Sequence, residues 1–356
     1  MFGQHRATQE GCSGGHTPYR LGVAHNGHHS WQYTTSQAGT HAADDLCDIK
    51  DVTGDFPAVI GFDLRGLNHK ALTTMTWLIQ RANQRGNIVT LSWHQHNPIS
   101  GASVYTTDDH HGVDVSNIIS RILVHGDHND VYRKELDVIA EWAKQLVDSH
   151  GNLIPVLFRP YHEMNGQWFW WGTNPVTNNT VADYKKLFQY TVTYLRDTKG
   201  VHNFLYAFSP SKPHSNSDYL RFYPGDNFVD VMGMDFYYSR PFHPSVQTFL
   251  AAVQVVTEVA TAHDKIAAIT EVGISNNGIE THHKFWNDHI LEPLKGGTNT
   301  LKVAYMLTWT NACLNGYTIY VPFNKHASTI NFRLFYNDSV TVFGYVLSDH
   351  SQAIIG

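Results

Sequence analysis

A single acid, Glu163, lies within the aromatic-rich run RPYHEMNGQWFWW at positions 159–171. An apolar stretch at 153–158 precedes this run, so we expect Glu163 to follow the end of a buried strand. A carboxyl group in apolar surroundings tends to keep its proton near neutral pH, because desolvation disfavours the anion. Indole rings offer flat faces on which a sugar ring can stack. An acid that can donate a proton beside such rings suggests carbohydrate chemistry.

A second acid, Glu271, follows another apolar run at 266–269. If both runs are strands of one barrel, their ends face each other across its axis, and the two carboxyl groups can flank one bond. Glycoside hydrolysis needs such a pair: one acid protonates the leaving oxygen, and the other attacks the anomeric carbon or activates water. A separation of about 5–5.5 Å between them would indicate a retaining mechanism. A structural ion pair is the alternative for each Glu, and their placement at facing strand ends favours catalysis.

Short apolar runs bounded by polar turns predict eight parallel strands that are covered on both faces. Amphipathic segments between them predict helices. The alternation predicts the α/β class and a single (β/α)8 TIM barrel, in which residues 1–356 form one catalytic domain. The predicted strands are 2–5, 58–62, 88–91, 153–158, 204–208, 229–234, 266–269 and 303–307, and the predicted helices are 71–83, 130–149, 181–197, 245–262 and 282–294.

Three long loops follow predicted strands one, three and eight, at about 7–52, 97–128 and 310–328. In a barrel these loops lie on the face where ligands bind. We therefore expect them to shape an active-site cleft.

The composition excludes several kinds of partner. With 42% apolar and 16% charged residues the chain can form a large core, and disorder is not expected. A net charge of -6 and the absence of any Lys or Arg run argue against nucleic acid or a membrane surface, and fit a neutral ligand. We expect an extracellular monomer whose signal has been removed. Because 2–5 already has the pattern of a strand, we also expect the sequence to begin inside a longer precursor.

The three cysteines, Cys12, Cys47 and Cys313, lack the spacing of a metal site. Cys12 and Cys47 bracket a polar stretch that a disulfide would close into a loop. The alternative is three unlinked thiols, and both interpretations remain open at this stage.

The 24 histidines include clusters that resemble metal sites in composition. None has the i, i+4 pair of a His-Glu-x-x-His site. Solvated loop histidines are the better interpretation, and we expect no metal and no other cofactor. The clusters are His25, His28 and His29, then His94 and His96, then the run DDHH at 108–111.

Taken together, the motifs resemble glycoside hydrolase family 26, the β-mannanases. The resemblance covers essentially the whole chain and implies that Glu163 is the general acid/base and Glu271 the nucleophile. Its motifs are the runs 159–172, SWH at 92–94, GMDFY at 233–237, 269–273, LTW at 307–309 and 51–59.

The resemblance also implies supporting roles. Tyr237 would donate a hydrogen bond to Glu271 and keep it ionised and aimed. His162 would position the catalytic carboxyl groups, and Arg159 would supply positive charge behind them. In the wider clan Asn is usual at the position of His162, so this His agrees with family 26 in particular.

Substrate contacts follow from the same resemblance. His94, Trp168 and Trp309 would line the sugar site at the cleaved bond, and Asp235 would support the contacts after predicted strand six. Ordinary packing is the alternative for both Trp residues, and a structural role is the alternative for His94. Thr310 stands where some relatives have Arg, so distal sugars on that side must be bound by other groups.

The sequence thus predicts a retaining enzyme that cleaves β-1,4-mannosidic linkages in mannan-type polysaccharides and manno-oligosaccharides by double displacement through Glu271. It is compatible with endo action and with release of mannobiose from one chain end. The alternatives are a family relative that acts on β-1,3-1,4-glucan or β-1,3-xylan, and a carbohydrate-binding barrel without catalytic activity.

Overall fold

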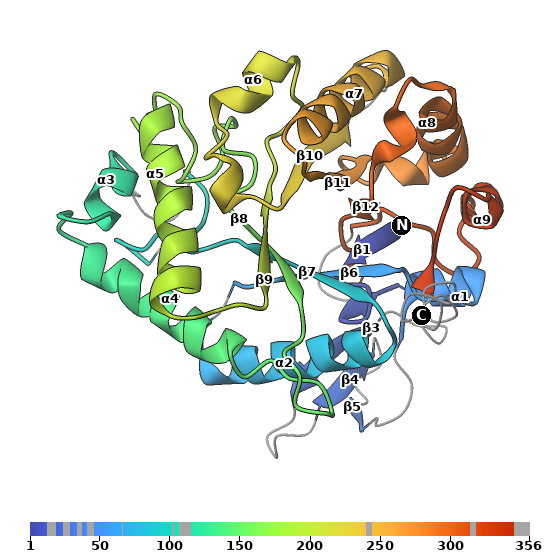
Figure 1. Ribbon diagram of the computed structural model, residues 1–356. Coiled ribbons are helices and arrows are strands. Elements are labelled where there is room, and N and C mark those ends of the chain that lie inside the picture. Colours follow the sequence, from blue (N-terminus) through green and yellow to red (C-terminus); the bar gives the residue numbers. More distant parts are fainter. Residues whose placement is uncertain are drawn as a thin grey trace.

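The computed structural model describes residues 1–12, 19–23, 29–33, 38–40, 46–65, 67–101, 103–106, 115–239, 244–313 and 318–344. Its centre is a closed barrel of parallel strands in the order β1-β12-β11-β10-β9-β8-β7-β6 (Figure 1). All eight predicted strands are found, and the predicted (β/α)8 barrel is confirmed. The barrel strands are β1 (Phe2–His5), β6 (Val59–Asp63), β7 (Ile88–Trp93), β8 (Val156–Pro160), β9 (Phe204–Phe208), β10 (Val231–Tyr238), β11 (Ile266–Ile274) and β12 (Tyr305–Thr308).

Two apolar clusters hold the barrel together. The larger one packs the outer faces of the strands against the surrounding helices. The smaller one joins residues of β6, β9, β10, β11 and β12 inside the barrel. Because both faces of each strand are covered, the strands have the continuous apolar runs from which they were predicted.

Four of the five predicted helices begin within two residues of a helix in the structure: α2 (His69–Gln84), α4 (Asn129–Ala143), α5 (Val181–Val192) and α7 (Val246–Ala262). Three of them start at a residue whose side chain accepts a hydrogen bond from a backbone N–H of the first turn. These residues are Asn68, Thr180 and Ser245.

The C-terminal ends of the helices differ more from prediction. Helix α4 ends at Ala143, before the predicted end at 149, because Val147 pairs with Leu153 in an isolated bridge. The fifth predicted helix begins at Phe285 as a π-helical segment, η4 (Phe285–Leu291), and continues as α8 (Glu292–Gly296), which has Pro293 in its first turn. Helix α5 is continued by η1 (Thr193–Thr198), a π-helical segment that the predicted helix 181–197 already covers. Not predicted were α1 (Asp48–Thr53), α3 (Ile118–Ile122), α6 (Asn216–Arg221), α9 (Thr329–Asn337) and the short turns η2 (Asp226–Phe228), η3 (Gly278–Glu280) and η5 (Thr300–Lys302).

The segment predicted as a long loop at 7–52 contains a small antiparallel sheet with the strand order β2-β3-β4-β5. This part of the prediction was incomplete, because short polar strands lack the apolar runs of the barrel strands. The sheet is formed by β2 (Glu10–Gly11), β3 (Tyr19–Val23), β4 (His29–Tyr33) and β5 (Ala38–Thr40).

The disulfide joins Cys12 to Cys313, and Cys47 is a buried free thiol whose pKa is raised to about 12 by burial. Both interpretations of the sequence, a Cys12–Cys47 bridge and three unlinked thiols, were therefore wrong. Strands β1 and β12 are neighbours in the closed barrel, so the loops that follow them meet although 301 residues separate the two cysteines. Among the described helices, none is long and apolar enough to cross a membrane.

Candidate active site

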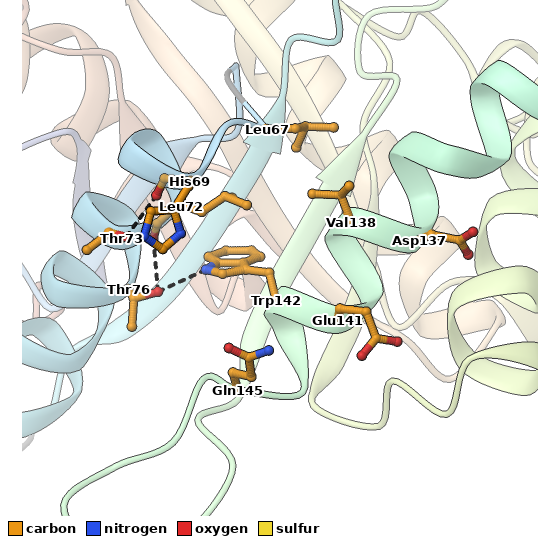
Figure 2. Close-up of a pocket in the computed structure, with 10 residues that line it drawn as sticks. All are labelled: Leu67, His69, Leu72, Thr73, Thr76, Asp137, Val138, Glu141, Trp142 and Gln145. Carbon is orange, nitrogen blue, oxygen red and sulfur yellow. Dashed lines mark hydrogen bonds between the residues drawn. The ribbon is translucent and has the colours of Figure 1, made fainter.

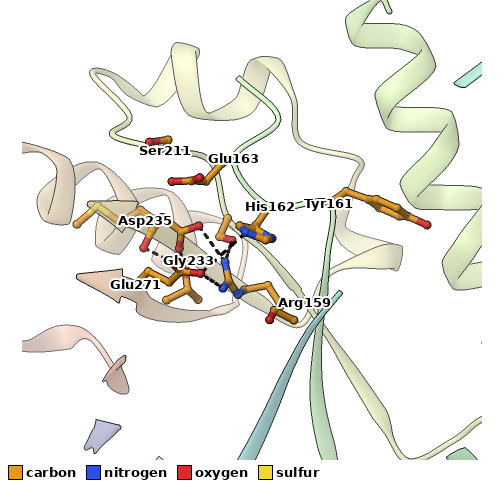
Figure 3. Close-up of polar contacts among 12 residues, drawn as sticks. Arg159, Tyr161, His162, Glu163, Ser211, Gly233, Asp235 and Glu271 are labelled. Atoms are coloured by element: carbon orange, nitrogen blue, oxygen red, sulfur yellow. Dashed lines mark hydrogen bonds and ion pairs between the residues drawn. The ribbon is translucent and has the colours of Figure 1, made fainter. Parts of the chain in front are cut away.

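The nine predicted site residues lie at, or shortly after, the C-terminal ends of barrel strands. His94 follows β7, Asp235 and Tyr237 lie on β10, and Trp309 follows β12. Figure 3 shows Arg159, His162 and Glu163, from β8 and the loop after it, converging with Asp235 and Glu271. The structure thus brings the two predicted acids to one end of the barrel, as the motif analysis required.

Glu271 lies on β11 next to an irregularity in the sheet. Met234 pairs with Ile269 but Asp235 pairs with Glu271, so Thr270 is an extra residue on this strand. Such a bulge changes the direction in which the following side chain points, and bulges are common beside active sites. The result is that Glu271 and its neighbour Asp235 approach the same guanidinium group.

Two donors hold the buried carboxyl group of Glu271, which is 5% exposed. Arg159 Nη2 forms a hydrogen-bonded ion pair with Oε1, and the Tyr237 hydroxyl donates to Oε2 at 2.6 Å. His162 Nε2 lies 3.9 Å from Oε1. Both donors fix the direction in which the carboxyl group points, as an attacking nucleophile would need.

Arg159 connects the buried charges. Its Nη1 donates to Asp235 Oδ2 at 2.9 Å and to Ser209 Oγ at 3.1 Å, while its Nη2 contacts Glu271. Burial opposes its charge, but Asp235 and Glu271 outweigh burial and raise the pKa of Arg159. The site therefore has a permanent cation at its base.

Asp235 lies behind the carboxyl groups of Glu163 and Glu271, fully buried. Its Oδ1 accepts from the Thr270 hydroxyl at 2.7 Å, and its Oδ2 accepts from Arg159. Burial raises the pKa of Asp235 well above its usual value against the effect of Arg159, and Glu271 and Glu163 raise it further. This placement suits a support for Arg159, and the expected part of Asp235 in substrate contacts stays a prediction.

Glu163 has a different environment. Its backbone lies in the left-handed region, with φ at 54°, and its N–H donates to the carbonyl of Ser209 at 2.8 Å. The indole N–H of Trp168 donates to its Oε2 at 2.9 Å. Burial, followed by the negative charge of Glu271, raises the pKa of Glu163 to about 7. A carboxyl group with this pKa can give up a proton and take one back near neutral pH.

His162 is buried among rings. The centroid of its ring lies 4.6 Å from that of His94 and 5.1 Å from that of Phe169, both edge to face. The Trp171 indole N–H donates to the backbone carbonyl of His162 at 2.7 Å. Burial, followed by the charge of Arg159, keeps the pKa of His162 well below its usual value, so this ring is neutral.

Two residues that were not predicted from the motifs contact His94 and Trp309, whose expected contacts with sugar stay a prediction. Asp63, at the end of β6, accepts from Nδ1 of His94 at 3.0 Å and from its backbone N–H at 3.1 Å. His5, at the end of β1, stacks on Trp309 at 4.1 Å between centroids, with 14° between the planes. Their positions at the ends of predicted strands were the available signal.

The aromatic run after Glu163 divides into an exposed ring and three buried ones. Trp168 is 40% exposed, and Phe169, Trp170 and Trp171 are buried. Gly166 lies against the Trp168 ring, because a Cβ at this glycine would come within 2.4 Å of the ring carbon Cζ2. The open side of Trp168 is thus available for stacking, beside the acid that it contacts.

One group of possible metal ligands was found in the described part of the chain: His162, Glu163 and Asp235 have ligand atoms within 4.8 Å of one another. The guanidinium of Arg159 already contacts Asp235, and a metal cation there would face a positive charge. The cluster fits proton transfer better than metal binding. Of the predicted solvated histidines, His96 is exposed. His94 is buried, so that interpretation was wrong for this residue, which packs at the site beside Asp63. The clusters 25–29 and 108–111 lie outside the described side chains.

A hollow of about 480 Å³ lies elsewhere, between helices α2 and α4 on the outside of the barrel (Figure 2). Trp142 lies in its wall and donates its indole N–H to the Thr76 hydroxyl at 2.9 Å. None of the predicted site residues lines it. Its lining residues are Leu67, His69, Leu72, Thr73, Thr76, Asp137, Val138, Glu141, Trp142 and Gln145.

Comparison with known proteins agrees with the geometry. The model of glycosyl hydrolase family 26 matches residues 24–312. A mannan endo-1,4-β-mannosidase of Bifidobacterium adolescentis is 37% identical over 292 residues, which are 74% of this chain and 27% of that protein. One from Bacillus subtilis is 32% identical over 212 residues, 54% of each chain. The chain thus spans only about a quarter to a half of the length of these relatives.

A solved structure also matches nearly the whole chain. The structure of a family 26 β-mannanase from Bacteroides ovatus is similar with a TM-score of 0.79 and 27% sequence identity. The match covers 97% of this chain and 90% of that one. The likeness therefore includes the strands that place Glu163 and Glu271.

Proposed function

Because the chain belongs to glycosyl hydrolase family 26, we propose that it hydrolyses β-1,4-mannosidic linkages by a retaining, double-displacement mechanism. The observation that carries the proposal is the contrast between two carboxyl groups at one barrel end. Burial raises the pKa of Glu163 to about 7, whereas Glu271 is held in an ion pair with Arg159. Two carboxyl groups in such different environments can act as an acid and a nucleophile at the same pH.

In the first step Glu163 donates its proton to the glycosidic oxygen while a carboxylate oxygen of Glu271 attacks the anomeric carbon. The bond between that carbon and the leaving oxygen breaks, and its electron pair stays on the oxygen, which takes the proton. Arg159 and Tyr237 hold Glu271 in position for this attack. The product is a mannosyl ester of Glu271 with inverted configuration.

In the second step Glu163 acts as a base. It removes a proton from water, whose oxygen attacks the anomeric carbon and displaces Glu271 as a carboxylate. The second inversion restores the original configuration. The charge of Glu271 is one cause of the raised pKa of Glu163. Because the ester is uncharged, the pKa of Glu163 falls while the ester exists, which suits a base.

The names of the relatives favour an endo-acting mannanase, and the comparisons do not favour the alternative on β-1,3-1,4-glucan or β-1,3-xylan. The product profile on mannohexaose, compared with glucan and xylan oligomers, tests this. We expect several product lengths from mannohexaose and none from the others. Mannobiose alone would instead indicate action from a chain end. Cleavage of glucan or xylan oligomers without cleavage of mannohexaose would contradict the proposal.

The stereochemistry is tested by NMR of the first products. We expect the β-anomer to accumulate before mutarotation, because two inversions give net retention. Initial release of the α-anomer would contradict the double displacement.

We further propose that the protein is an extracellular monomer. The Cys12–Cys313 disulfide supports this location, because disulfides persist mainly in oxidising compartments. Light scattering and fractionation of the producing cells test both points: we expect a mass near the 40.2 kDa of one chain, found outside the cells. A dimer, or activity confined to the cell interior, would contradict them.

A further inference from the structure

The segment 209–212, which follows β9, has no predicted site residue, yet it is joined to both sides of the site. The carbonyl of Ser209 accepts from the backbone N–H of Glu163 at 2.8 Å, and its hydroxyl accepts from Arg159 at 3.1 Å. Two residues on, this segment pairs with β10, where Ser211 and Asp235 form an isolated parallel bridge. The segment is thus fixed between the acid and the buried charges.

Asn165 fastens this segment to the loop that bears the acid. Its side-chain Nδ2 donates to the carbonyl of Ser211 at 2.6 Å, and its Oδ1 accepts from the N–H of Ser211 at 2.9 Å. The side-chain amide of Asn165 therefore binds the two peptide groups that flank Ser211, one through its NH₂ and the other through its oxygen. Since Asn165 comes two residues after Glu163, the position of Ser211 relative to the acid is set by a short connection.

The hydroxyl of Ser211 lies beside the carboxyl group of Glu163 (Figure 3). Burial and then the charge of Glu271 raise the pKa of Glu163, while the hydrogen bond from Trp168, the charge of Arg159 and the nearby hydroxyl of Ser211 lower it. A hydroxyl that donates to a carboxylate stabilises the charged form. Ser211 thus acts against the burial that makes Glu163 an acid.

We propose that Ser211 is a positioning residue for the general acid: held in place by Asn165, its hydroxyl orients the carboxyl group of Glu163. This inference rests on the proposed function, because the proton affinity of Glu163 affects turnover only if Glu163 donates and accepts a proton. A carboxyl group that held its proton too firmly would be a poor donor in the first step.

The effect of Ser211 can be separated from those of the charged groups that face Glu163. Replacing any charged neighbour would change the net charge of the site, whereas serine is neutral. The other partner, Trp168, is also expected to contact sugar. The charged and titratable groups around Glu163 are Arg159 on β8, His162 in the loop after β8, Lys212 in the loop after β9, Asp235 on β10 and Glu271 on β11.

The test compares Ser211→Ala with Ser211→Thr, which keeps a hydroxyl, and with Ser217→Ala, which removes an exposed hydroxyl on α6. The pH dependence of kcat/KM on mannohexaose and the NMR titration of ¹³C-labelled Glu163, assigned with Glu163→Gln, are measured for each. In Ser211→Ala we expect two pKa values to rise together by about half to one pH unit: the one on the basic side of the pH profile of kcat/KM and the one from the NMR titration of Glu163. Ser211→Thr and Ser217→Ala should keep wild-type values, and Asn165→Ala should move both in the direction of Ser211→Ala.

An unchanged titration of Glu163 in Ser211→Ala would overturn the inference, and so would an equal shift in Ser211→Thr. A merely structural role would lower the rate without moving the pH limb. If the wild-type protein cleaved no mannan-derived substrate, the proposed function would fail. The NMR titration needs no substrate, so it would still decide whether Ser211 controls the proton of Glu163.

Discussion

Glu163 and Glu271 share one end of the barrel but differ in what surrounds them. Glu271 receives hydrogen bonds from a guanidinium and a phenol, whereas Glu163 contacts an indole N–H and a serine in partly apolar surroundings. The same residue type therefore has two environments, one in an ion pair with Arg159 and one in which the pKa is raised. Burial and the choice of hydrogen-bond partner, more than residue type, assign the two roles.

Of the changes considered, removal of Glu271 should lower the activity most. We expect Glu271→Ala to lower the rate on mannan by roughly 10⁴-fold or more, because the covalent nucleophile is lost. Azide should partly restore cleavage of an activated aryl β-mannobioside and form the α-mannobiosyl azide. Glu258→Ala, which removes an exposed carboxyl group on α7, is the control and should keep activity. Near-native turnover of Glu271→Ala would exclude it as the nucleophile.

Removal of the acid should have the next largest effect and should depend on the leaving group. Glu163→Gln should lower the rate on mannan by about 10²–10⁴-fold, as loss of a general acid does. A dinitrophenyl leaving group needs no proton, so the first step on dinitrophenyl β-mannobioside should remain fast. Stopped-flow measurement of the burst checks this. Equal losses on both substrates would contradict the assignment of Glu163 as the proton donor.

The hydrogen bond from Tyr237 to Glu271 can be tested separately, and its loss should have a smaller effect. Tyr237→Phe removes the hydroxyl that donates to Glu271, and we expect kcat/KM to fall about tenfold to a hundredfold. Tyr336→Phe removes a hydroxyl on the outer helix α9 and serves as control. An unchanged rate in Tyr237→Phe would mean that Arg159 alone orients the nucleophile.

The smallest expected effect is on stability. A pKa of Glu163 raised to about 7 means that the folded protein keeps a proton that the unfolded chain loses near pH 4.5, so this group makes stability fall as pH rises between these values. Glu163→Gln, which stays neutral, should therefore have a higher Tm than the wild type at pH 8 and the same Tm at pH 4. Calorimetry at the two pH values measures the difference. A wild type that is the more stable at pH 8 would contradict the raised pKa.

Features that depend on burial could be predicted from the sequence. All eight strands and both acids were located, because a strand covered on both faces needs a continuous apolar run and the acids follow such runs. The site residues Arg159, His162 and Tyr237 came from motifs, and the structure brings them into contact with one another or with Glu271.

Features that depend on contacts between distant loops could not be predicted from the sequence. The Cys12–Cys313 disulfide joins the loops after the first and last barrel strands, which are neighbours in the closed barrel, whereas Cys47 is nearer to Cys12 in sequence. Asp63, the partner of His94, and Ser211, the neighbour of Glu163, follow strands without a distinctive motif. Their roles depend on which strand ends are neighbours in the folded barrel, and the order of the strands in the sequence does not show which loop side chains meet there.

The central claim is that Glu271 forms the covalent bond while Glu163 supplies the proton. The direct measurement is mass spectrometry of Glu163→Gln mixed with dinitrophenyl β-mannobioside, since slow deglycosylation should allow the intermediate to accumulate. We expect the intact protein to gain one mannobiosyl group, and peptide mapping to locate it on Glu271. A label on another residue, or rapid turnover to the α-anomer with no labelled enzyme, would contradict the account.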